Sequence, residues 1–367
     1  MALFLFISHM LFKINIFLLL VFVSSNVTSI EVTPFVRASL FYNTEPISYK
    51  AFIDDWDDHF WGGRKAIGLT SVEAGVGIDK WQISIFQRSV SYLKFHAETA
   101  EVLYLINNKL PLSPDRRYRV DLEMKHMLAD GFRIGRKIVA SPKFDWNLGL
   151  SLLSGKKIMD GSLIGYISAK SESDYDFDNI NLDYYYSVDR IFNHEAKNPS
   201  GQGLSVDMNF EWKPNKLFKV GWFIGDLFAF VDWHAAPTTV AQLESDNKTF
   251  DENGYVKIDP ILKGNQSQKD FRQYLPLHSN ILTETELTQH INLLLALKYT
   301  YLKSFAEIGV AFSHINNAHL HASYILNVQA FSIGIKNRYF QLQIALDDTN
   351  FSKTRFLNIS SSFFYHF

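Results

Sequence analysis

The chain contains no cysteine among its 367 residues. This absence excludes a disulfide scaffold, thiol catalysis and a thiolate metal site. An excess of charge of one sign is also lacking, because the formal net charge is only −2, and we therefore expect no nucleic-acid partner. The sequence has no glycine-rich phosphate loop, zinc-peptidase helix motif or nucleophile elbow, so we expect no cofactor.

Long hydrophobic runs are missing as well, except for one near the start of the chain. An apolar run follows Lys13, and small residues stand at positions 27–29. Residues 1–29 are therefore predicted to be a cleaved secretory signal peptide, with Met10 as an alternative start. An uncleaved membrane anchor is the alternative. Residues 30–367 contain no run of about twenty apolar residues, so we predict one domain without a helical span.

What the chain has in quantity is apolar side chains spread one by one along it. Hydrophobic residues make up 47% of the sequence and aromatic residues 15%, but charged residues only 20%. From Tyr118 to Met124 every second residue is apolar, and the residues between them are charged. Such a strand suits hydrocarbon on one face and a hydrated lumen on the other. The same alternation recurs at 204–212, 291–301 and 340–346.

The last residues of the chain are apolar on one face. Phe363, Tyr365 and the terminal Phe367 stand on that face, and Ser360 and Ser362 stand on the other. The pattern resembles the C-terminal strand of Gram-negative outer-membrane β-barrel proteins, which the barrel-insertion machinery recognises. The resemblance implies an all-β fold, a transmembrane antiparallel up-and-down β-barrel with long extracellular loops and short periplasmic turns. It also implies location in the cell outer membrane, with outer-membrane lipid and the insertion machinery as partners.

About sixteen segments of roughly ten residues have the period of two expected for tilted membrane strands. They are 33–42, 66–77, 81–94, 117–127, 143–153, 161–171, 178–187, 203–213, 217–232, 274–283, 289–301, 304–313, 318–326, 329–336, 338–347 and 355–367. With both chain ends in the periplasm, the long connections fall on the extracellular side, except for 128–142. If 318–336 is one bent strand, fourteen strands are the alternative.

Charged residues are predicted on the inward face of several strands. They are Glu73, Arg88, Arg117, Arg119, Asp121, Glu123, Lys125, Asp207, Glu211 and Lys298. One interpretation is a ladder of salt bridges that stiffens the wall. The other is a charged constriction that filters solutes in a water-filled pore. The mixed signs argue against a dedicated anion or cation filter.

Two further patterns carry weaker chemistry. His319 and His321 share a strand face at a spacing that can ligate a transition metal, but no carboxylate stands in the same segment. His321 and Ser323 have the His-X-Ser spacing of the outer-membrane phospholipases, in which histidine takes the serine proton. That family's site faces lipid, whereas alternation places these two residues in the lumen. Both patterns are more simply explained as polar filling of the lumen.

Three predicted loops have internal content. Residues 96–107 read as a short helix in the second long loop. Asn253 and Gly254 form the turn signal of a hairpin within 233–273. The first loop places acids beside aromatics at 54–61, which indicates aromatic packing on the rim, with a cation site or a sugar-stacking surface as alternatives.

The leading functional hypothesis is a porin-like channel for small solutes, gated or plugged by 95–116 or 233–273. The first alternative is a non-conducting barrel that serves surface display or an envelope secretion or assembly apparatus. The second alternative is an outer-membrane lipid hydrolase. Because the only catalytic signal is the His-X-Ser spacing, we expect that the protein is not an enzyme.

Overall fold

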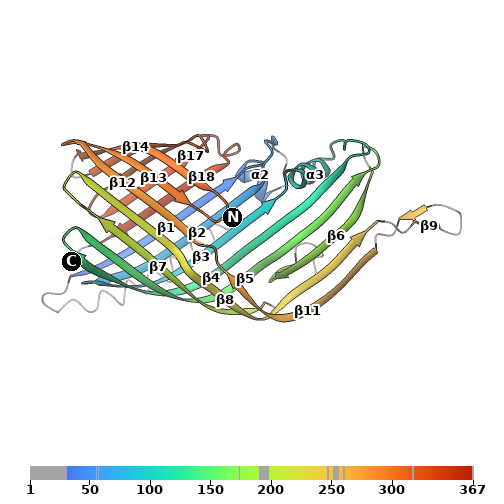
Figure 1. Cartoon of the computed structure of the whole chain (residues 1–367), viewed down its shortest axis with the longest axis horizontal. Helices are drawn as coiled ribbons and strands as arrows, with labels where there is room; N and C mark the ends of the chain where they lie inside the picture. Colours follow the sequence, from blue (N-terminus) through green and yellow to red (C-terminus); the bar gives the residue numbers. More distant parts are fainter. Residues whose placement is uncertain are drawn as a thin grey trace.

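The computed structural model describes residues 31–365, apart from 55, 57, 173, 190–197, 246–247, 251–255, 259–260 and 316–317. The predicted signal peptide lies outside the described residues. The main structure is one antiparallel sheet that closes on itself (Figure 1). Closure is made by β1 (Val32–Thr44), which pairs with β2 (Lys65–Ile78) on one side and with β18 (Phe356–Phe364) on the other. The fold is therefore an antiparallel β-barrel, as the strand alternation predicts.

Fourteen strands form the closed ring. After β1 and β2, the ring consists of β3 (Trp81–Phe95), β4 (Arg117–Ser141), β5 (Phe144–Ala169), β7 (Ser200–Trp212), β8 (Phe218–Glu244), β12 (His278–Thr288), β13 (Ile291–Tyr299), β14 (Ser304–Ile315), β15 (Ala318–Ile325), β16 (Ala330–Lys336), β17 (Phe340–Leu346) and β18. Two more strands of the sheet lie outside the ring. One is β6 (Tyr175–Tyr186), which continues the line of β7 between β5 and β8, and the other is β11 (Ile261–Tyr274), which continues the line of β12 along β8.

The strand count corrects the expected sixteen in an instructive way. The segments 143–153 and 161–171 are one continuous strand, β5, and the segment 178–187 corresponds to β6 outside the ring. These two changes reduce the ring to the alternative number of fourteen. The reason proposed for that alternative was wrong, because 318–336 does form two strands, β15 and β16.

The segment 128–142, predicted as a long connection on the periplasmic side, is not a loop. Strand β4 continues to Ser141, and only positions 142–143 separate it from β5. The loop predicted at 233–273 is also largely strand, since β8 reaches Glu244 and β11 begins at Ile261. Between them, β9 (Lys248–Phe250) and β10 (Val256–Ile258) pair as the predicted hairpin, whose turn residues lie outside the described part of the chain.

Helices are few and short. Among the described residues they are α2 (Tyr49–Ile53) and α3 (Ala97–Asn107), the second within one residue of the predicted helix. The His96 side chain accepts a hydrogen bond from the backbone N–H of Glu98 and so caps α3 at its N-terminus. In the described part of the chain, no helix has the length and apolar character needed to cross a membrane.

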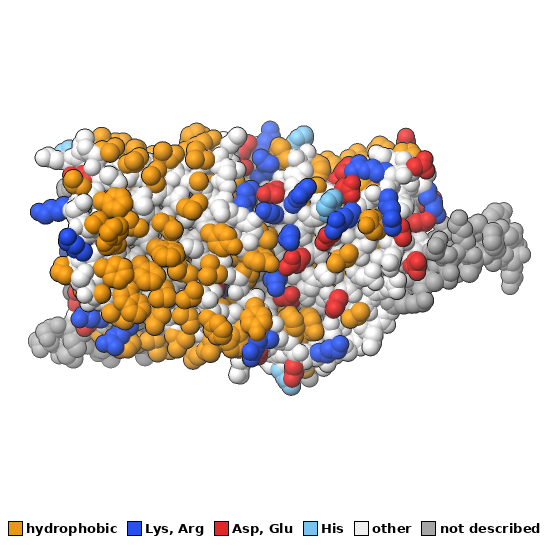
Figure 2. Space-filling view, in the orientation of Figure 1, with side chains coloured by type: hydrophobic (Ala, Val, Ile, Leu, Met, Phe, Trp, Pro, Cys, Tyr) orange, Lys and Arg blue, Asp and Glu red, His pale blue; other side chains and the backbone are white. Residues whose placement is uncertain are grey.

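Apolar side chains cover the outside of the half of the barrel that contains the C-terminus, which we call the lower half (left in Figure 2). Leu150 is 50% exposed there, Phe331 68% and Ile333 65%. The predicted outward residues Leu295 and Leu297 are exposed in the same way. A broad exposed apolar belt on a closed barrel is the pattern of a wall in contact with hydrocarbon.

The other half of the molecule, which we call the extension, has the opposite arrangement. It consists of the upper parts of β4 (117–124), β5 (158–169) and β8 (235–244), together with β6 and α3. Its outer surface is rich in charged side chains (Figure 2). Its inner side chains form apolar clusters, in which Val102 of α3 packs with Tyr118 and Ile167.

The predicted faces of 117–125 are therefore wrong. Tyr118, Val120 and Met124 are at most 4% exposed and point into the extension, whereas Arg117 and Arg119 point outward into solvent. Residues three apart on a regular strand point to opposite faces, but Met124 and Met127 of β4 are both buried. The set of inward residues therefore changes from even to odd numbers between them. Below this change, exposed Phe132 and Ile134 point outward, so the apolar face has moved from the inside of the wall to the outside.

Candidate functional site

The interior of the lower half contains a compact cluster of charges. Glu73 lies at its centre, 3.6 Å from Arg37 Nη1 and 3.4 Å from Arg133 Nη1. The hydroxyl of Ser84 donates to the same carboxylate at 2.6 Å. Arg133 also binds Asp207, with 2.6 Å between Nη2 and Oδ2, so one guanidinium joins two carboxylates from different strands.

Asp226 extends this cluster toward β12. Its carboxylate lies 2.8 Å from Arg88 Nη1, accepts a hydrogen bond from Ser205 at 2.7 Å, and lies 3.5 Å from His278 Nδ1. The backbone of Asp226 has φ 55°, next to a shift of register between β7 and β8. This local irregularity turns the side chain inward and lets the backbone N–H of Asp226 donate to Asp207 at 2.9 Å.

A cavity of about 310 Å³ lies against this cluster. Its polar wall contains Glu73, Arg88, Arg133, Asp207, Asp226, His278 and Lys298, and its apolar wall contains Phe41, Leu69, Phe86, Val90, Tyr92 and Phe223. Ser39 and Phe223, in the same wall, are solvent-exposed, so water reaches the cavity.

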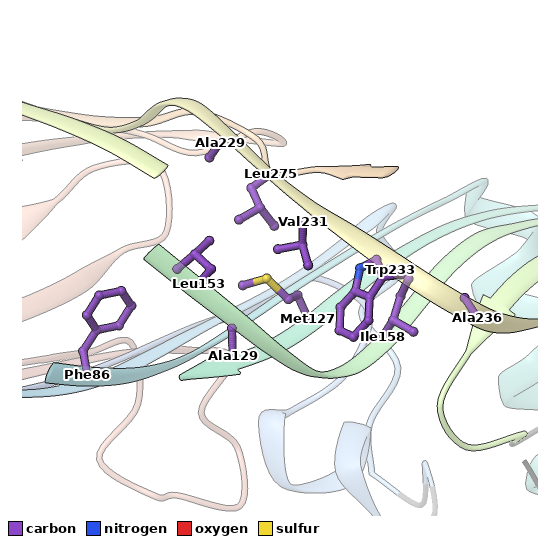
Figure 3. Close-up of a cluster of buried hydrophobic side chains, with 10 residues drawn as sticks. All are labelled: Phe86, Met127, Ala129, Leu153, Ile158, Ala229, Val231, Trp233, Ala236 and Leu275. Carbon is purple, nitrogen blue, oxygen red and sulfur yellow. The ribbon is translucent and has the colours of Figure 1, made fainter. Parts of the chain in front are cut away.

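Above the cavity, apolar side chains fill the interior. One cluster contains Phe86 of β3, Met127 of β4 and Val231 of β8, together with Trp233 (Figure 3). A second cluster is formed on the facing strands, where the rings of Phe41, Phe305 and Phe356 pack in mutual contact at centroid distances of 5.3 to 5.6 Å. Val90 packs against both clusters. We call the two clusters together the apolar layer.

Trp233 is the largest buried side chain of the apolar layer and is 1% exposed. It lies over Gly155 and Gly201, which are register partners on β5 and β7. A Cβ added at Gly155 would come within 2.5 Å of the indole, so glycine is required for this contact. The indole N–H donates to Gln273 Oε1 at 3.2 Å, which satisfies its one polar group.

The predicted inward charges divide into three groups. Glu73, Arg88, Asp207 and Lys298 come together around the cavity. Glu211 lies at the lower rim, where it binds Lys213 and Lys219. The residues of 117–125 lie in the extension or at its edge. Arg117 binds Asp178 and Lys94 binds Glu123 across strands, and Arg119 binds Asp121 on the same strand. Lys125 lies 3.7 Å from Asp160 there, so none of these five lines the cavity.

Four members of the charge cluster were not predicted from the sequence. Arg37 stands between apolar residues in β1, and its inward direction follows from simple alternation. Arg133 was missed because the predicted strand stopped at position 127. Asp226 reaches the cluster because of the irregularity in β8, and His278 because β12 begins there. The sequence has no local signal for either feature.

The weaker candidates do not assemble into a reactive site. Ser323 points inward as predicted, but its hydroxyl donates to the carboxylate of Glu307 on the neighbouring strand instead of bonding to His321. Across the described residues, no group of three or more histidine or acidic side chains could hold a metal ion, and His319 and His321 belong to no such group.

Aromatic residues of the chain end and of the first loop lie at the outer wall and at the rim. Phe363 and Tyr365 are exposed on the outer wall, and the ring of Phe363 packs on Phe340 at 5.5 Å. Phe367 lies outside the described residues. In the first loop, Phe60 stacks on Tyr104 of α3 at 4.9 Å, which is the predicted packing of aromatics on the rim.

Comparisons with known proteins add little beyond the fold. No protein-family model matches the chain, and no curated protein matches it. Among solved structures, it is similar to the Pseudomonas putida toluene transporter TodX, at 9% identity and a TM-score of 0.42 over 93% of this chain and 91% of that one. A Pseudomonas aeruginosa FadL homologue shows 11% identity and a TM-score of 0.39 over 92% and 90%. At these values, the fold assignment depends on the chain's own strand pairing.

Proposed function

We propose that this protein is a porin-like outer-membrane channel of a Gram-negative bacterium that admits small solutes. The observation that carries the proposal is the solvent-accessible, charged cavity inside a closed barrel whose outer wall bears an apolar belt. If the inward charged side chains only stiffened the wall, no water-accessible space beside their ion pairs would be needed. Ion pairs that line such a space select solutes by charge and size.

The route to the membrane follows from the two ends of the chain. Residues 1–29 direct export and are removed, and the C-terminal strand with Phe363, Tyr365 and Phe367 addresses the chain to the insertion machinery. The exposed belt then contacts outer-membrane lipid. The chain ends face the periplasm, and the extension stands in water on the extracellular side.

The apolar layer makes the described structure a closed channel. It lies between the cavity and the extension, and its members are apolar side chains from both sides of the barrel. Apolar constrictions block ions because water is unstable inside them. Trp233 is the natural gate residue, because it is the bulkiest member of the layer and is held by one hydrogen bond and two glycine contacts.

Ion conductance in planar bilayers tests the proposal. The wild-type protein is expected to show low or intermittent conductance, and Trp233→Ala is expected to raise it by removing the largest side chain from the layer. Trp222→Ala is the matched control, since Trp222 is on the same strand but is 42% exposed on the outer wall. If neither the wild type nor Trp233→Ala conducts while both are folded, the channel proposal is wrong.

The same apolar layer favours one second candidate. If it stays closed in every state, the protein is a non-conducting barrel that displays the extension outside the cell, in surface display or an envelope secretion or assembly apparatus. In that case, removing β9 and β10, which stand in the connection from β8 of the extension to β11, would abolish the biological role but leave conductance absent in all variants.

A further inference from the structure

The guanidinium of Arg88 is only half satisfied. Nη1 binds Asp226, but Nε and Nη2 are both buried without a hydrogen-bond partner. Arg88 is 8% exposed and lines the cavity. Leaving charged donors buried and unpaired is costly, so a group that accepts hydrogen bonds is expected at this edge.

The geometry of the free edge restricts what that group can be. Nε–H and the adjacent Nη2–H point in the same direction and form the fork with which arginine binds two oxygen atoms of one anion. The third nitrogen, Nη1, already holds Asp226. Arg88 is therefore fixed by one carboxylate, and the two nitrogens of its other edge are buried with no partner among the described residues.

Lys298 supplies a second cation in the same cavity wall. Its ammonium lies 3.7 Å from the centre of the Phe41 ring, and no ion pair to it occurs among the described residues. Glu307 acts on it only at longer range. The three carboxylates of the wall, Glu73, Asp207 and Asp226, each have an arginine partner already. The wall therefore holds three cations and three carboxylates, and Lys298 is the cation without a carboxylate partner in the described part of the chain.

The rest of the lining is largely apolar and belongs mostly to the apolar layer. Phe41, Phe86 and Tyr92 each present a ring there, and Leu69 and Val90 fill the space between them. At about 310 Å³, the cavity is at the small end of the range for ligand sites, roughly 300–1,000 Å³. It suits an apolar body of a few carbon atoms or one ring.

We propose that the cavity is a binding site for a small organic anion, with its carboxylate on Arg88 and Lys298 and its apolar body against Phe41, Phe86 and Tyr92. This inference rests on the proposed channel function in one respect, because it names the class of solute that pauses in the lumen. The site lies directly below the apolar layer, so an occupant contacts the side chains that close the channel.

Calorimetric titration of the full mature protein in detergent tests the site with three probes. Benzoate carries both features, benzyl alcohol keeps the ring without the charge, and inorganic phosphate keeps the charge without the ring. Benzoate is expected to bind at least about tenfold more tightly than either of the others, because each lacks one half of the recognition. Equal binding of benzoate and benzyl alcohol, or no binding of benzoate, would overturn the proposal, since water would then satisfy Arg88. Phosphate binding as tight as that of benzoate would overturn it as well.

Lys298→Met is the first variant, because it removes the ammonium group that has no carboxylate partner, and each wall carboxylate keeps its arginine. It should lose most of the preference for benzoate over benzyl alcohol. Arg88→Gln combined with Asp226→Asn removes the fork and its partner together, so no buried charge is left alone. Lys219→Met is the matched control at the lower rim, where Lys219 binds Glu211, and it should keep the preference.

The outcome for the site is separable from the outcome for the channel. If the protein conducts but benzoate shows no preference, the site is refuted and the channel remains. If benzoate binds with the expected preference but no variant conducts, the site stands and the channel is refuted. An unchanged preference in both Lys298→Met and the Arg88 double variant, with both folded, contradicts the assignment of the residues.

Discussion

The lower half and the extension share long strands but differ in the kind of side chain on each face. The outer face is apolar in the lower half and charged in the extension (Figure 2). On β5, Leu150 and Ile164 are equally exposed, at 50% and 51%. Leu150 pairs with the apolar residues Ile134 and Val206, whereas Ile164 pairs with the polar residues Asp121 and Asn181. Inside, the lower half holds arginines and carboxylates, whereas the extension holds Tyr118, Leu182 and other apolar residues. The medium in contact with the outer face of each region therefore determines which side chains, polar or apolar, are left to fill its interior.

The transition between the two regions is abrupt. On β4 it falls between Met124 and Met127, and on β5 the ladder shifts register between the pairs of Leu128 and Ala129. An extra residue in one strand reverses the faces beyond it, because successive side chains alternate. On β5, the extra residue Lys156 therefore accompanies the change of faces without ending the strand, whereas β4 changes phase without a register shift against β3.

The largest expected effect comes from placing a charge on each outer surface. Leu150→Arg should block assembly, because an arginine facing hydrocarbon costs about 2–4 kcal/mol near the midplane. Ile164→Arg on the same strand should assemble normally, since water surrounds that position. Resistance of the folded barrel to SDS without heating measures assembly. Equal behaviour of the two variants would show that both positions meet the same solvent.

This contrast also explains which parts of the fold the sequence could predict. Alternation shows that a strand such as 117–125 has two unlike faces, but it does not say which face meets water or hydrocarbon. The strand was assigned as membrane wall because its charges alternate so regularly. That regularity instead reflects water outside and a packed core inside, with cross-strand ion pairs such as Arg117 with Asp178.

The candidate site was predictable only in part, for a related reason. Glu73, Arg88, Asp207 and Lys298 lie on regular strands, so period two places them inside. Their partners are decided by closure of the barrel, as with Arg88 and Asp226, which are 138 residues apart in sequence. No local pattern encodes such a pair, and the positive φ at Asp226 breaks the alternation at that point.

A smaller effect is expected when a methylene group is removed from the core of the extension and from the outer wall of the lower half. Ile180 is 4% exposed in the core of the extension, so Ile180→Val should cost about 0.5–1.5 kcal/mol by opening a small void. Ile308 is 44% exposed on the lower outer wall, where lipid chains fill the space of a lost methylene, and Ile308→Val should be close to neutral. Amide hydrogen exchange in β6 and β14 measures each effect. A neutral Ile180→Val would mean that the extension is loosely packed.

The smallest effect is a pH dependence confined to the extension. Burial raises the pKa of Asp160 above its ordinary value, although Lys125 at 3.7 Å and a hydrogen bond from Gln273 at 3.1 Å act in the opposite direction. The folded extension therefore holds the proton more tightly than the unfolded chain does. Its stability should be greatest below about pH 3.9, the ordinary aspartate value, and should fall as the pH rises to the higher folded pKa.

Replacing the carboxyl of Asp160 by an amide isolates this dependence. Asp160→Asn should flatten the pH profile of exchange protection in β5 and β6 above about pH 3.9, after correction for intrinsic exchange rates. Asp183→Asn is the control, because Asp183 is exposed on the neighbouring strand and its removal should leave the profile unchanged. Protection in the lower half should not follow pH in either variant, because Asp160 belongs to the part of β5 that pairs with β6 outside the ring. A shift that reached β14 would show that the two regions unfold as one unit, and the bulge on β5 would then join them instead of separating them.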